Sequence, residues 1–94
     1  MTLREVREEI DQIDKEIIAL VLKRTRLAGK VLKEKRVEDQ QVNDEVQNQI
    51  VLNRAAEYAT ELNLDVGEVK NIFKILIRMN IEKQKELMGD GNLP

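Results

Sequence analysis

Two cations interrupt the apolar face of the first third of this chain. From Leu3 to Val31 apolar residues recur every three or four positions, which is the spacing of one helix face, but the stripe meets Arg24 and later Lys35. These two residues are separated by three helical turns plus about 20°, so they share a face and lie roughly 16 Å apart. Two long cationic side chains could therefore reach one small anion held between them.

Polar side chains also interrupt the apolar faces of two further helices that the pattern predicts. The interrupting residues are Asp44, Gln47 and Asn48 in the second helix and Asn80 and Gln84 in the third. Burying such groups unpaired would cost several kcal/mol in total, roughly estimated. Their occurrence on every helix predicts a polar pocket inside the bundle, cationic on one side and rich in amides on the other. A pocket of this kind suits a small dianion.

Each of these residues also has a purely structural interpretation. Arg24 could extend to water or pair with a carboxylate, and Lys35 could complement the dipole at the end of its helix. Amides in a helical seam can set the register of packing. Asp44 could act only as a helix cap. The pocket is favoured because the interruptions coincide on all three helices.

Composition excludes several other functions. The 94 residues include no Cys and no His, so there is no disulfide, thiol nucleophile, Cys/His metal site or histidine base. The net charge of −2 gives no general attraction to nucleic acid or to an anionic membrane. No apolar run approaches the length of a membrane span, and no signal peptide is evident. We therefore predict a soluble, cytoplasmic protein.

The sequence predicts an all-α fold with three helices in one domain, residues 1–88, followed by a disordered tail, residues 89–94. The helices are expected at about 2–36, 44–62 and 66–88. The predicted caps are Thr2 with Glu5, Asn43, and Asp65 with Glu68. The residues expected to face inward are Val51, Ala55, Tyr58 and Leu62 in the second helix and Val69, Ile72, Phe73, Leu76 and Ile77 in the third.

The first helix is too long for a compact monomer. A helix over residues 2–36 would span roughly 50 Å. A compact globule of this chain length has a radius of gyration of about 12 Å. The two shorter helices cannot cover both ends of such a rod, so its apolar stripe requires a second copy of itself. We predict a homodimer with intertwined long helices.

These features resemble the all-helical chorismate mutases (the AroQ class). The resemblance covers essentially the whole chain, and the stretches that carry it are VREEIDQIDKEIIALVLKR, LAGKVLKEK, VNDEV and IFKILIRMNIEKQ. It implies an intertwined homodimer with two equivalent sites and no cofactor. The implied reaction is the Claisen rearrangement of chorismate to prephenate, which leads to phenylalanine and tyrosine.

The resemblance assigns catalytic roles to four residues. Arg24 matches an arginine that holds a substrate carboxylate, Lys35 a lysine that reaches the ether oxygen and a carboxylate, and Gln84 a glutamine on the same ether oxygen. Arg7 matches an arginine that the other subunit donates. Because Arg7 lies about 25 Å from Arg24 along one helix, only a partner chain could bring it to that pocket.

The second helix carries the departures from the family pattern. Asp44 matches an acidic residue near the substrate hydroxyl, and Asn80 takes the place of a small polar residue. Gln47 and Asn48 stand where the family usually has Arg and Glu. One cation and one carboxylate are thus lost together, but both amides can still hydrogen-bond the substrate. A nearby cation such as Arg36 is an alternative source of the missing charge.

Two other functions compete with the mutase. An isochorismate-pyruvate lyase resembles this fold and shares the cationic pocket, and product analysis on the two substrates would separate them. A non-catalytic helical dimerisation module would use the polar residues only to set register. In that case Arg24→Ala and Lys35→Ala would leave function intact.

Overall fold

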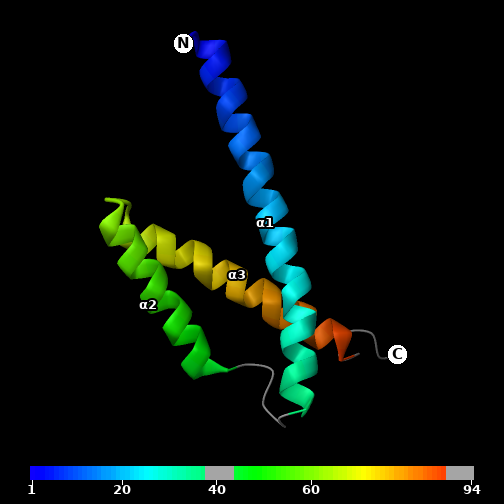
Figure 1. Ribbon diagram of the computed structural model, residues 1–94. Coiled ribbons are helices and arrows are strands. Elements are labelled where there is room, and N and C mark those ends of the chain that lie inside the picture. The colour runs from blue at the N-terminus through cyan, green and yellow to red at the C-terminus, as the bar shows by residue number, and fades with distance from the viewer. Residues whose placement is uncertain (38–43, 89–94) are drawn as a thin grey trace.

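The structure, a computed structural model, consists of three helices. It describes residues 1–37 and 44–88, without the side chains of residues 32 and 34–37. Helix α1 spans Leu3–Val37, α2 spans Glu45–Glu61 and α3 spans Val66–Leu87 (Figure 1). The described residues contain no strand. The all-α prediction with a very long first helix is confirmed, with each boundary shifted by one residue or less. The predicted tail lies outside the described residues.

Side-chain caps define where the helices begin. The Thr2 hydroxyl accepts a hydrogen bond from the Glu5 backbone N–H and donates one to the Glu5 carboxylate. Asp65 accepts from the N–H of Glu68 at 2.9 Å, as predicted. The predicted cap at Asn43 is wrong. The neighbouring Asp44 has the extended backbone of a cap and accepts from the backbone N–H of Gln47. Its carboxylate also complements the positive helix N-terminus, which an amide cannot do.

The turn between α2 and α3 depends on one left-handed residue. Asn63 has φ 56°, a conformation that Asn adopts more readily than most residues. This places the N–H of Leu64 on the carbonyl of Ala59 at 2.9 Å and the N–H of Asn63 on that of Thr60. The pair of bonds is the Schellman motif that closes helix C-termini. It reverses the chain so that α3 can pack along α2.

Helix α3 is the central element of the chain. It packs against α2 along one part and crosses the C-terminal half of α1 along another, while the N-terminal half of α1 projects beyond both (Figure 1). The radius of gyration is 16.6 Å and the longest extent 53 Å, against about 12 Å for a compact chain of this length. The projecting part of α1 is therefore unsupported within one chain.

No helix in the described residues is long and apolar enough to cross a membrane.

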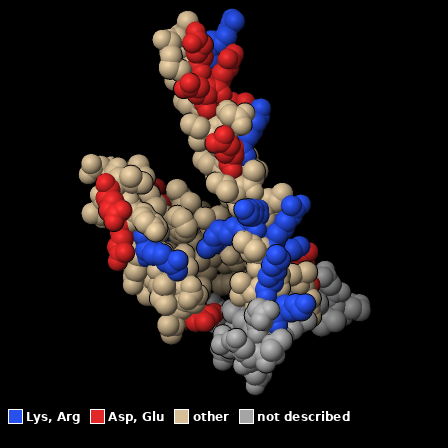
Figure 2. Space-filling view, in the orientation of Figure 1, with Lys and Arg blue, Asp and Glu red and all other residues tan. Residues whose placement is uncertain are grey.

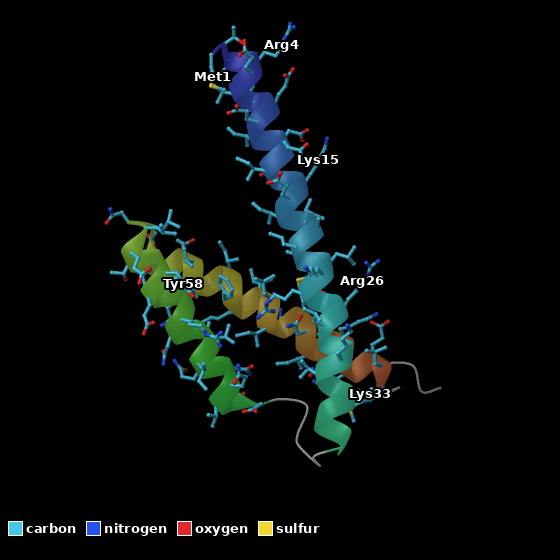
Figure 3. The ribbon with its side chains drawn as sticks, viewed as in Figure 1. Met1, Arg4, Lys15, Arg26, Lys33 and Tyr58 are labelled. Carbon is cyan, nitrogen blue, oxygen red and sulfur yellow. The ribbon has the colours of Figure 1, made fainter. Side chains whose placement is uncertain are left out.

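The core of one chain is small. Among described residues only Ala28, Ala55, Ala59 and Gln84 are buried. The alanines let the helix backbones approach closely, but they bury little apolar area. The predicted inward positions of three other residues are wrong for a single chain, since the side chains of Tyr58, Leu62 and Ile72 are exposed. Helix α2 turns its Ala55–Ala59 edge inward instead, and Tyr58 extends from α2 in Figure 3.

Candidate active site

A cavity of about 270 Å³ lies where the three helices meet. Figure 2 shows it as a recess between α2 and the lower half of α1. Its charged and polar lining consists of Arg24, Asp44, Gln47, Asn48, Asn80 and Gln84. Its apolar lining consists of Leu27, Ala28, Val31, Val51, Ile77 and Ile81. Six of the eight predicted site residues therefore line one cavity.

Arg24 supplies the positive charge of this cavity. Its Nη1 atom is shielded from solvent and has no hydrogen-bond partner. Within the described part of the chain the guanidinium forms no ion pair, and its central carbon lies 6.0 Å from the centroid of the Phe73 ring. Burial lowers the pKa of Arg24 because desolvation disfavours the charged form, but an arginine still stays protonated at neutral pH. The structural interpretation in which a carboxylate of the same chain neutralises Arg24 is not supported.

Gln84 is the one buried polar side chain among the described residues, with 4% of its surface exposed. Its Nε2 donates to the backbone carbonyl of Ala28 at 3.1 Å, so the amide of α3 is tied to α1. A carbonyl oxygen only accepts, which determines which end of the amide faces α1. The second hydrogen of Nε2 and the Oε1 atom stay available to a ligand. The side chain is thus held in one orientation at the edge of the cavity.

The wall formed by α2 is acidic at its start and neutral afterwards. Asp44 combines two roles, because it caps α2 and lines the cavity. Gln47 is exposed, and Asn48 is half-buried on the same wall. From α3, the half-buried Asn80 adds a further amide. These groups can donate to oxygen atoms of a ligand or accept from its hydroxyl.

The other two predicted residues are not among the described residues that line this cavity. Lys35 belongs to the last turns of α1, and its side chain lies outside the described residues. Arg7 lies on the projecting half of α1, where it lines a separate surface hollow with Arg4 and Asp11. Figure 3 shows that part of α1 standing clear of α2 and α3. Along the helix, Arg7 is about 25 Å from Arg24.

Two contributors to the site were missed by sequence reasoning. Phe73 was predicted to face inward, but nothing in the periodicity indicated that its ring would lie beneath Arg24. The carbonyl of Ala28 carries no signal in the sequence, since every residue has one. The small residues Ala28 and Gly29 were the available hint, because they allow α3 to approach closely at this point.

Comparisons with known proteins agree on one family. The sequence model of a family described as chorismate mutase type II matches residues 6–85. A chorismate mutase of Methanocaldococcus jannaschii is 33% identical over 88 residues, which cover 94% of this chain and 89% of that protein. A bifunctional chorismate mutase/prephenate dehydratase of Buchnera aphidicola is 29% identical over 91 residues. That match covers 93% of this chain but only 24% of the bifunctional protein.

Proposed function

This chain belongs to the chorismate mutase type II family, and we propose on that basis that it rearranges chorismate to prephenate in the synthesis of phenylalanine and tyrosine. The observation that carries the proposal is the unpaired Arg24 guanidinium in a cavity that the fixed amide of Gln84 also lines. The bifunctional relative is about four times as long as the region matched here. We therefore assign only the mutase reaction to this region.

The rearrangement needs no nucleophile, which suits a chain without Cys or His. It requires the substrate to be held compactly, with its two reacting ends close together. We assign to Arg24 the binding of one carboxylate by charge-assisted hydrogen bonds. We assign to Asp44 a hydrogen bond from the substrate hydroxyl, and to Gln47, Asn48 and Asn80 hydrogen bonds to its other oxygen atoms.

The rate acceleration is assigned to Gln84 and Lys35. As the C–O bond breaks, negative charge builds on the ether oxygen, and donors to that atom strengthen only in the transition state. Gln84 is suited to this role because its hydrogen bond to Ala28 already fixes its orientation. Little reorganisation is then needed at the moment of reaction. Lys35 is the second donor that we propose.

A dimer is part of the proposal because one chain leaves too much apolar surface exposed. Its accessible surface is 7664 Å², against about 5,600 Å² for a compact monomer of this mass. On the projecting half of α1, Leu3 is 65% exposed, Ile13 53% and Leu20 63%. The excess of roughly 2,000 Å² per chain is in the range of obligate homodimer interfaces. We propose that a second copy covers this stripe with its own α1.

Charge balance in the cavity supports the same dimer. Among the described lining residues, Arg24 is the one cation and Asp44 the one carboxylate, so together they carry no net charge. A dianionic substrate needs further positive charge to offset its desolvation. We propose that two cations supply it, Lys35 of the same chain and Arg7 of the partner subunit. Residues 1–88 would then form one domain of an intertwined pair, which we place in the cytoplasm.

The direct test is the formation of prephenate from chorismate by the purified chain. Lys35→Ala should lower kcat by about two to three orders of magnitude, the usual effect of removing one donor to a developing negative charge. Arg24→Ala should also raise KM, because its contact holds the substrate before reaction. Lys33→Ala is the matched control, since that exposed lysine of α1 does not line the cavity.

Two results would contradict the proposal. One is a Lys35→Ala variant with kcat close to that of the wild type. The other is pyruvate release from isochorismate without prephenate formation from chorismate, which would identify a lyase on the same fold.

A further inference from the structure

We propose that Phe73 is a positioning residue, whose aromatic ring holds the Arg24 guanidinium in place to receive a substrate carboxylate. The carbon of the guanidinium lies over this ring at 6.0 Å from its centroid. Phe73 itself does not line the cavity, so it would act on the substrate only through Arg24. The inference rests on the proposed function, since the anion in question is the substrate of that reaction.

Position and burial connect the ring to the site. Phe73 is half-buried on α3, one helical turn before Ile77, which lines the cavity. Arg24 reaches the same point from α1, near where the two helices cross. The ring therefore lies next to the guanidinium, between α3 and α1. An arginine side chain has several rotatable bonds, so a fixed contact of this kind restricts where its charge can lie.

The contact orients Arg24 without consuming its hydrogen-bond donors. A cation is attracted to the face of an aromatic ring by the ring's quadrupole, and no N–H is used up. Arg24 makes no hydrogen bond or ion pair with any described residue, and its shielded Nη1 lacks a partner. Its donors are therefore unpaired before the substrate arrives. A carboxylate of the same chain in place of the ring would have neutralised the charge that the substrate needs.

This arrangement predicts an effect on substrate binding rather than on turnover. The carboxylate held by Arg24 keeps its charge throughout the rearrangement, so a change in the position of Arg24 affects ground state and transition state alike. Such uniform binding appears in KM and not in kcat. Phe73→Leu keeps an apolar side chain but removes the aromatic face. We expect KM for chorismate to rise about three- to tenfold, with kcat changing less than about twofold.

Two companion variants separate the ring's charge interaction from simple packing. Phe73→Tyr retains the aromatic face and should restore KM to near the wild-type value. Leu76→Val removes a similar apolar volume one turn along α3, from a half-buried residue that does not line the cavity, and should leave KM unchanged. Phe73→Met is measured in place of Phe73→Leu if the latter does not fold.

A double-mutant cycle with Arg24→Gln gives the decisive result. If Phe73 acts through Arg24, Phe73→Leu should weaken binding by less than about twofold once the guanidinium is gone. The same loss with and without Arg24 would overturn the proposal, and so would an unchanged KM in Phe73→Leu, or in Phe73→Met where that variant replaces it.

The cycle is also measured by calorimetric binding of prephenate, which requires no turnover. Coupling between Phe73 and Arg24 in prephenate binding by a chain that does not convert chorismate would support the positioning role and reject the mutase activity. Conversion of chorismate without such coupling would reject the positioning role alone.

Discussion

At the scale of single residues, the cavity is lined by two polar side chains that form few hydrogen bonds within the described chain. Gln84 donates one hydrogen bond to the carbonyl of Ala28, and Arg24 forms no hydrogen bond within the described chain. A buried donor without a partner costs roughly 1–3 kcal/mol, more when it is charged. Binding of a suitable anion would remove that cost. The free energy lost by leaving this donor unpaired would thus be regained on binding.

Replacing Gln84 by Glu should make both the stability and the activity of the protein decrease as the pH rises. A protonated carboxyl can donate to the Ala28 carbonyl as the amide does, but a carboxylate cannot, and burial also disfavours its charge. The pKa of the new group should therefore be raised above the ordinary value of about 4.3. Its stabilising contribution is then fully present below that value and is lost as pH rises through the raised pKa.

The free energy of unfolding of Gln84→Glu, measured in urea, should be lower at pH 8 than at pH 5. This decrease should exceed that of the wild type by about 1–3 kcal/mol. The kcat of Gln84→Glu should fall over the same interval, while that of the wild type shows no corresponding titration. Gln49→Glu introduces the same group at an exposed position of α2 and is the control. Equal stability of Gln84→Glu at both pH values would show that the bond to Ala28 is dispensable.

The neutral wall of α2 should weaken substrate binding. Gln47 lines the cavity with an amide, and a neutral hydrogen bond contributes about 1 kcal/mol against roughly 1.5–3 for one to a charged group. The double variant Gln47→Arg with Asn48→Glu should lower KM about tenfold, equivalent to about 1.4 kcal/mol, with little change in kcat. Gln49→Arg, an exposed residue outside the cavity lining, controls for added charge. An unchanged KM would instead favour another cation, such as Arg36, in that role.

At the scale of the helices, α1 and α3 pack against each other and both line the cavity. Small residues on α1 let α3 approach, and a Cβ atom at Gly29 would lie 3.2 Å from Cδ1 of Leu87. Leu87 is in the last turn of α3 and 49% exposed, so it has room to rotate away. The atom closest to Gly29 at this crossing thus belongs to the movable side chain of Leu87 and not to the backbone of α3.

Gly29→Ala should stabilise the protein. Alanine is favoured over glycine inside a helix by about 1 kcal/mol, and displacing Leu87 should offset only part of this gain. Urea unfolding should show an increase of up to about 1 kcal/mol. Gly29→Val, which is bulkier and β-branched, should lack this benefit. A loss of stability in Gly29→Ala would mean that contacts from outside the single chain hold Leu87 in place.

At the scale of the whole molecule, the exposed stripe of α1 and the position of Arg7 predict a site shared between two subunits. Equimolar Arg7→Ala and Lys35→Ala chains, each inactive alone, should regain about a quarter of wild-type activity after subunit exchange. Half of the dimers are then mixed, and each mixed dimer has one intact site of two. The activity of the mixture, measured after exchange has been verified, checks this.

The control for that mixture combines both substitutions in one chain. Exchange of the Arg7→Ala/Lys35→Ala chain with wild type leaves no intact site in a mixed dimer, so no recovery is expected beyond the remaining wild-type dimers. Failure of the first mixture to recover, or sedimentation of an active 10.9 kDa monomer, would contradict the shared site.

The sequence by itself determined the helices and most of the cavity lining. Helix periodicity depends on neighbours three and four residues apart, so the pattern placed Arg24, Asn80 and Gln84 on inner faces without knowledge of the fold. Capping is equally local, which is why Thr2 and Asp65 were predicted correctly and the cap of α2 was wrong by one residue. The prediction of a partner chain also followed from the length of α1 alone.

Only the tertiary structure decided how those faces meet. The bond from Gln84 to Ala28 joins residues 56 positions apart and ends on a backbone carbonyl, a group that every residue shares. The place of Phe73 beneath Arg24 depends on where two helices cross. The exposure of Tyr58 and Ile72 likewise depends on how α2 and α3 are rotated about their axes. Such rotations are determined by packing between distant segments, and a local pattern fixes them only approximately.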